Sequence, residues 1–128
     1  MFKDIREGEY VQARWRPVEG RGAQVFRVRR TGAGIVALGA ITMPTQDGGV
    51  GLEVQIELDS NWLVRSVRIA TSDGRERRLE HDGAGSWLEN GAPALDLAGC
   101  MDIDLSASPI TNTLPVRRLP WCDNKAGP

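Results

Sequence analysis

The chain has 128 residues, which is an ordinary length for a single domain. Its 16 basic and 17 acidic residues give a net charge of −1, so it lacks the positive surplus that binders of nucleic acid or anionic membranes carry. Apolar residues make up 41%, as in ordinary globular proteins, while 15 glycines and 7 prolines favour turns and short strands over a helix bundle.

The first ten residues contain no apolar run that could act as a signal-peptide core. No later segment approaches the length of about 18 uncharged apolar residues that a membrane-spanning helix needs. We therefore expect a cytoplasmic protein without an integral membrane segment.

Alternation of apolar and polar residues is the strongest pattern in the first half of the chain. Residues 11–16 and 25–30 read as short strands rich in arginine, and residues 34–41 form an apolar run that glycines interrupt. Over residues 52–59 every second residue is apolar, as a half-buried antiparallel strand requires. We predict a strand over residues 50–58 from this pattern.

The second half of the chain predicts a β-hairpin. Alternating segments over residues 62–70 and 75–81 flank a turn that contains Asp73 and Gly74, a pair typical of hairpins. The remaining pattern indicates short strands at 86–88 and 100–105 and a proline-containing extended loop at 106–120. Helical periodicity is scarce, so we predict an all-β fold, a curved antiparallel sheet of about six to eight short strands with one apolar face.

The last third of the chain carries an extended motif. Residues 99–105 read GCMDIDL, and residues 108–119 read SPITNTLPVRRL. This order resembles the signature of a bacterial glycolipid-binding family. A weaker likeness continues upstream and includes the spacing between Trp62 and Arg65. The resemblance therefore covers about residues 10–120.

The resemblance implies an antiparallel sheet rolled into an incompletely closed barrel, similar to bacterial lipoprotein carriers, with an apolar cavity on its concave side for a lipid or glycolipid. Members of the family usually continue with further strands after the Arg-Arg-Leu sequence found here at residues 117–119, whereas this sequence ends nine residues later. We therefore expect one domain over residues 1–128 that lacks the family's C-terminal strands. Its open sheet edge is expected to pair with another chain, for example in a homo-oligomer.

Eight residues are candidates for contacts with such a ligand. The apolar candidates are Val54, Ile56, Trp62 and Trp87, and the polar or charged candidates are Arg65, Asp104, Asn112 and Arg117. Alternation places Arg65 on the apolar face, where its guanidinium could hold a phosphate or carboxylate; otherwise it pairs with an internal carboxylate, or a bulge turns it to solvent. The alternative for the tryptophans is burial in the core. The alternative for the polar groups is hydrogen bonding to the backbone of their own turns.

Catalytic and metal chemistry have little support in the sequence. The single histidine, His81, lies near no nucleophile motif, and Cys100 and Cys122 lack companion ligands for a metal ion. Asp102 and Asp104 share one face of a predicted strand, about 7 Å apart, a spacing that overlaps the carboxylate separation of inverting glycosidases. The same pair is also typical of a solvated strand face.

We therefore predict a non-catalytic module that binds a lipid or glycolipid on the concave apolar face of the sheet, without metal or cofactor. Two alternatives stay open. One is a protein-interaction module that pairs through its open sheet edge, and the other is a glycoside hydrolase that uses Asp102 and Asp104. Nucleic acid is not expected among the partners, because the charge is balanced.

Overall fold

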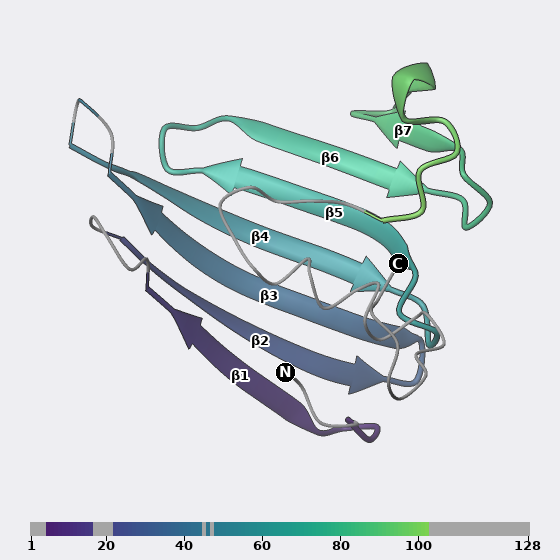
Figure 1. Cartoon of the computed structure of the whole chain (residues 1–128), viewed down its shortest axis with the longest axis horizontal. Helices are drawn as coiled ribbons and strands as arrows, with labels where there is room; N and C mark the ends of the chain where they lie inside the picture. The colour runs from purple at the N-terminus through teal and green to yellow at the C-terminus, as the bar shows by residue number, and fades with distance from the viewer. Residues whose placement is uncertain (1–4, 17–21, 45, 47, 103–128) are drawn as a thin grey trace, which may run out of the picture.

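The computed structural model describes residues 5–16, 22–44, 46 and 48–102 of the chain. Eight strands form one antiparallel sheet in which each strand pairs with the next along the chain (Figure 1). The strands are β1 (Tyr10–Trp15), β2 (Ala23–Thr31), β3 (Gly34–Met43), β4 (Val50–Leu58), β5 (Val64–Thr71), β6 (Glu76–His81), β7 (Trp87–Glu89) and β8 (Ala92–Pro93). A 3-10 turn, η1 (Leu95–Leu97), is the one helical element of the described residues. The prediction of an all-β fold is confirmed.

The predicted hairpin between β5 and β6 is present. β4 occupies the predicted residues 50–58, and both hairpin strands begin and end within two residues of their predicted bounds. The chain turns at Gly74, whose φ of 93° suits glycine and whose N–H donates to the carbonyl of Thr71 at 3.0 Å. The Asp-Gly signal therefore located this connection correctly.

The prediction of a strand over residues 100–105 is wrong for the residues that the structure describes. Residues 100–102 are not in a strand, and residues 103–105 lie outside the described part. The N–H of Cys100 donates to the carbonyl of Leu97 at 3.0 Å, and its own carbonyl accepts from the indole N–H of Trp87 at 2.8 Å. These bonds hold the backbone in a turn beside β7 and occupy groups that a strand would pair with a neighbour.

The sheet has an apolar and a polar side. In the register of the three central strands, Ala37, Ile56 and Val67 lie next to one another, and all three are buried. We call this side the core face. The intervening residues, such as Arg27 and Gln55, point to the opposite side, which we call the polar face.

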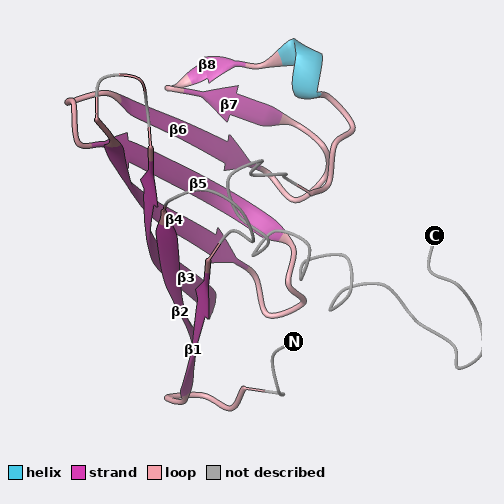
Figure 2. Cartoon of the chain, turned by 60° about the vertical axis from the view of Figure 1, so that its left-hand side comes forward, coloured by secondary structure: helices cyan, strands magenta, loops and turns pink. Residues whose placement is uncertain are grey.

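The sheet is not closed into a barrel. Among the described residues, β1 pairs with β2 and with no other strand, and β8 pairs with β7 alone. Figure 2 shows the sheet bending between β1–β4 and β5–β8. Buried side chains of both parts, from Phe26 on β2 to Trp87 on β7, belong to one cluster, so the core face lies on the inner side of the bend. The predicted architecture, a curved and incompletely closed sheet with a concave apolar side, is therefore present.

Candidate functional site

Three half-buried apolar side chains cross the core face diagonally. Leu52 on β4, Ile69 on β5 and Leu79 on β6 pack against the buried core and keep part of their surface exposed. Ile69 lies opposite Val54, and Leu79 lies opposite Val67, so the three side chains follow the border of the core. We call these three residues the apolar row. Diagonal neighbours in a sheet are about 7–8 Å apart, which lets one extended ligand chain contact all three.

A pair of opposite charges borders the apolar row. Arg77 lies opposite Ile69 and Glu89 lies opposite Leu79, so both charged residues are on the core face. The Nε of Arg77 lies 2.5 Å from a carboxylate oxygen of Glu89, and the two side chains are 60% and 37% exposed. Such an exposed pair adds about 1 kcal/mol or less to stability. The apolar surface thus ends at accessible hydrogen-bonding groups.

The four apolar residues predicted to contact the ligand are core residues. Val54, Ile56, Trp62 and Trp87 are 3%, 1%, 8% and 4% exposed. They belong to one hydrophobic cluster on the concave side, so the structure brings them together on the predicted face. They form the buried base of this face, while the apolar row supplies its accessible surface.

Trp87 and His81 close the core next to β7. Their rings are stacked, with centroids 4.4 Å apart and planes inclined by 18°. His81 Nδ1 lies 2.8 Å from the carbonyl oxygen of Val64, and the N–H of Gly85 lies 3.0 Å from Nε2. Because a carbonyl oxygen only accepts hydrogen bonds, we assign the proton to Nδ1, and Nε2 accepts from Gly85. Both ring nitrogens are therefore engaged with backbone groups, which is a structural role.

Trp62 reaches the core from a left-handed backbone conformation. Its φ is 66°, which is rare for a bulky residue. Asp59 fixes the turn, because its carboxylate accepts from the N–H groups of Asn61 at 2.8 Å and Leu63 at 3.1 Å. The turn and the burial of the indole together hold this strained conformation in place.

The prediction that Arg65 points into the core face is wrong. A bulge shifts the register between β4 and β5, so that Ser66 lies opposite Glu57 and Arg65 is the extra residue. The Arg65 side chain is exposed on the polar face, where its Nε donates to the carbonyl of His81 at 3.0 Å. The bulge considered as an alternative in the sequence analysis is thus the arrangement observed.

Asp104, Asn112 and Arg117 lie outside the described residues, as does one member of the predicted carboxylate pair. Its other member, Asp102, is half-buried. Within the described part of the chain, no group of three His, Cys, Asp or Glu side chains could hold a metal ion. No helix in that part is long and apolar enough to cross a membrane.

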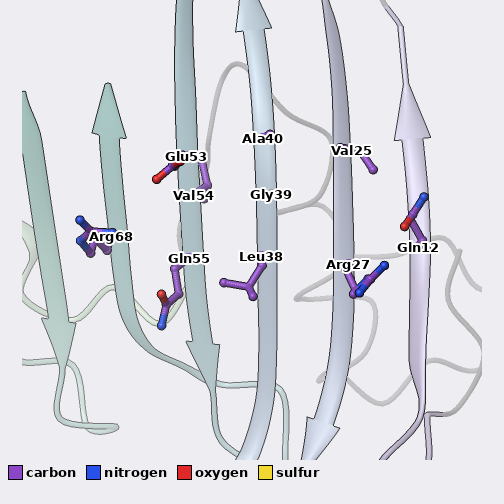
Figure 3. Close-up of a pocket in the computed structure, with 10 residues that line it drawn as sticks. All are labelled: Gln12, Val25, Arg27, Leu38, Gly39, Ala40, Glu53, Val54, Gln55 and Arg68. Carbon is purple, nitrogen blue, oxygen red and sulfur yellow. The ribbon is translucent and has the colours of Figure 1, made fainter. Parts of the chain in front are cut away.

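The polar face carries a hollow that the sequence pattern did not predict (Figure 3). It has a volume of about 390 Å³ and a floor of aliphatic side chains, Val25, Leu38 and Ala40. Its signal in the sequence is the apolar run of β3, in which residues of both faces are apolar. Because alternation disappears in such a run, the pattern did not separate an apolar stripe on the polar face from the core.

Arg68 stands at the edge of this hollow in a fixed orientation. Its Nε and Nη2 donate to the two carboxylate oxygens of Glu76 at 2.7 and 3.2 Å. This hydrogen bonding, and then the opposite charge, raises the pKa of Arg68 and lowers the pKa of Glu76. Both groups are solvent-exposed, so the pair orients the guanidinium more than it stabilises the fold.

Comparison with known proteins places the chain in a family. Residues 12–126 match the family described as "Putative glycolipid-binding". The fold is similar to the crystal structure of a DUF1089 family protein from Pseudomonas aeruginosa, with a TM-score of 0.68 and 27% identity. That match covers 87% of this chain and 63% of the other, so the chain spans less than two thirds of that protein's length. No curated protein matches the chain. The family match covers most of the sequence, and the chain therefore belongs to the putative glycolipid-binding family.

Proposed function

We propose that the protein is a non-catalytic module that binds an amphipathic lipid, and specifically a glycolipid, on the concave core face. The observation that carries this proposal is the apolar row, which stays partly exposed on the inner side of an unclosed sheet. The family match supports a binding role.

In this proposal the acyl chain lies along the apolar row. Burial of each methylene group contributes about 0.8 kcal/mol, so contact along three side chains supplies most of the affinity. Val54 and Ile56 form the rigid base beneath the row, and Trp62 and Trp87 complete the same cluster. A preformed base of this kind lowers the conformational entropy that binding would otherwise cost.

The polar headgroup lies at Arg77 and Glu89 in this arrangement. A guanidinium offers only donors and a carboxylate only acceptors, whereas a sugar hydroxyl can do both. The ion pair therefore suits a sugar headgroup at the end of the apolar row. Asp104, Asn112 and Arg117 stay predictions for additional polar contacts.

No catalytic step is part of the proposal. His81 is the single histidine of the chain, and both of its ring nitrogens are held by backbone groups. A general base needs a free nitrogen within reach of its substrate. Because both nitrogens of the His81 ring are hydrogen-bonded and the ring is buried, His81 is not suited to act as a general base.

A fluorescence titration tests the proposal. The full chain is titrated with a monoglycosyl diacylglycerol, kept below the concentration at which this lipid aggregates, and separately with the free sugar. We expect the lipid to change tryptophan emission in a saturable way, because Trp15 and Trp87 belong to or pack against the core. The free sugar alone is expected to leave the emission unchanged.

Two substitutions on neighbouring residues form a matched pair for this titration. Ile69→Asn puts a polar group in the apolar row, whereas Ala70→Asn changes the polar face of the same strand. We expect at least about tenfold weaker lipid binding for Ile69→Asn and unchanged binding for Ala70→Asn. Leu79→Ser is a second test if Ile69→Asn fails to fold. Equal effects of both neighbours, or flat titrations of the wild type with several acyl lipids, contradict the proposal.

A further inference from the structure

The polar face carries a second hollow beside the one already described. It has a volume of about 670 Å³ and lies over β4, β5 and β6. Gln55 and Arg68 line both hollows, so the two lie side by side. Their volumes fall within the range of about 300–1,000 Å³ that is typical of ligand sites. We call the combined feature the polar-face groove.

The floor of the groove is apolar at the centre of the sheet. Leu38 is 46% exposed there, with Val25 and Ala40 on the neighbouring positions. Because these side chains are shorter than the arginines, glutamines and glutamates on the strands around them, the floor lies below its walls. A pyranose ring has apolar C–H faces and a rim of hydroxyl groups, which fits a low apolar floor between polar walls.

The walls carry planar hydrogen-bonding groups on both sides of this floor. Figure 3 shows Gln12 and Arg27 on one side, and Glu53, Gln55 and Arg68 on the other. Guanidinium, amide and carboxylate groups each offer two parallel donor or acceptor positions, which match neighbouring hydroxyls of a sugar.

Several of these wall groups are held in place before any ligand binds. Gln55 donates to Glu57 at 2.9 Å, and the hydroxyl of Ser66 donates to the same carboxylate at 3.3 Å. On the other side of the floor, the Arg27 guanidinium lies 4.6 Å from the ring centroid of Tyr10. A site whose side chains are already ordered loses less conformational entropy on binding.

The lining of the groove has a small positive excess, which a glutamate at its border offsets. Its arginines are Arg27, Arg65, Arg68 and Arg78, and its carboxylates are Glu53, Glu57 and Glu80. Glu76, next to the groove, neutralises Arg68. With Glu76 included, the groove and its border carry four positive and four negative groups, whereas a surface for phosphate-rich ligands needs a positive surplus. We propose that the polar-face groove binds an uncharged oligosaccharide.

This site is independent of the proposed lipid site. The groove and the apolar row lie on opposite faces of the same strands, so one sugar headgroup on the core face cannot fill the groove. The oligosaccharide is therefore a second ligand. Ile69→Asn is expected to leave its binding unchanged, which separates a failure of this proposal from a failure of the first.

Nitrogen-15 NMR titrations of the full chain test the inference. The probes are maltotriose, cellotriose, laminaritriose and N-acetylchitotriose, with a heparin tetrasaccharide as the charged comparison. We expect at least one uncharged probe to shift the side-chain N–H signals of Gln12, Gln55, Arg27 and Arg68 in a saturable way. No saturable shift with any uncharged probe, or tighter and salt-sensitive binding of heparin, would overturn the proposal.

Two arginines of β2 provide a matched pair of variants. Arg27 lines the groove, whereas Arg29 lies two residues along on the same face and outside it. Arg27→Ala is expected to weaken binding of the active probe about tenfold, as for a lost charge-assisted hydrogen bond, and Arg29→Ala to leave it unchanged. Leu38→Arg, which fills the floor, is expected to abolish binding. Equal losses for Arg27→Ala and Arg29→Ala would show that the contact is nonspecific and would refute the site.

Discussion

The ring of Phe26 occupies the space that a side chain at Gly39 would need. The two residues lie opposite each other in the register of β2 and β3, and a Cβ at residue 39 would collide with the edge of the ring. Phe26 is fully buried as a result. A glycine in the middle of β3 thus allows the largest side chain of β2 to pack flat against the sheet.

Gly39→Ala is expected to destabilise the fold by about 1–3 kcal/mol, because the added methyl group overpacks the core beneath Phe26. Gly51→Ala is the control, since a Cβ there meets only the side chain of Ser72 at ordinary contact distance. The control is expected to be neutral or slightly stabilising. Urea unfolding of both variants measures the difference, and similar stabilities would show that the ring of Phe26 moves aside at little cost.

His81→Phe is expected to keep the stacking on Trp87 and to lose both backbone hydrogen bonds. The carbonyl of Val64 and the N–H of Gly85 are then left without these partners, at about 1–3 kcal/mol for each buried group. Leu88→Ala, an exposed change on β7, is expected to alter stability by less than about 0.5 kcal/mol. Thermal or urea unfolding compares the two. Wild-type stability of His81→Phe would mean that the two bonds contribute nothing net.

The carboxylate of Asp82 is expected to titrate below the ordinary range of aspartate. Its pKa is lowered because it accepts from the N–H groups of Ala84 at 2.7 Å and Ser86 at 3.1 Å. A lowered pKa in the folded state gives a stabilisation that is complete above the pKa of the unfolded chain, about 3.9. That stabilisation is lost as the pH falls through the lowered folded value.

Carbon-13 NMR of the side-chain carboxyl measures this titration. The same chain in concentrated urea serves as the reference, where Asp82 is expected to return to its ordinary pKa. Matching midpoints in the folded and unfolded chains would mean that the turn does not hold the carboxylate.

β1 is expected to mediate self-association. Its side away from β2 pairs with no other strand in the described part of the chain. Open edges of this kind pair with other strands unless they are covered or charged. Light scattering at micromolar concentrations is expected to give a mass above that of one chain, rising with concentration. A mass of one chain at every concentration would contradict self-association through β1.

The sheet could be predicted from the sequence because apolar and polar residues alternate in strands such as β4. In β4 every second residue points to the core, and the Asp-Gly pair marks the turn that joins β5 to β6. The face of Arg65 could not be predicted this way, because one bulge residue reverses the direction of the side chains that precede it. Alternation assumes an uninterrupted register, and the sequence contains no separate signal for the shift.

The candidate site was predictable only in part, because the sequence pattern does not show how deeply each side chain is buried. The pattern assigned Val54 and Ile56 to the apolar face, but it did not distinguish buried residues from half-exposed ones such as Ile69. That distinction depends on how far each position lies from the border of the core. The polar-face groove forms because short side chains such as Leu38 lie between longer ones on neighbouring strands. It can be recognised only when the register of those strands is known.

Mass spectrometry of the lipids that remain bound to the purified chain shows whether the core face holds a lipid. We expect an acyl-chain lipid with a sugar headgroup in near-stoichiometric amount on the wild type and on Ala70→Asn, and a strong loss of that lipid on Ile69→Asn. Only trace lipid on all three proteins, together with no uptake of added monoglycosyl diacylglycerol, would contradict a lipid site on the core face.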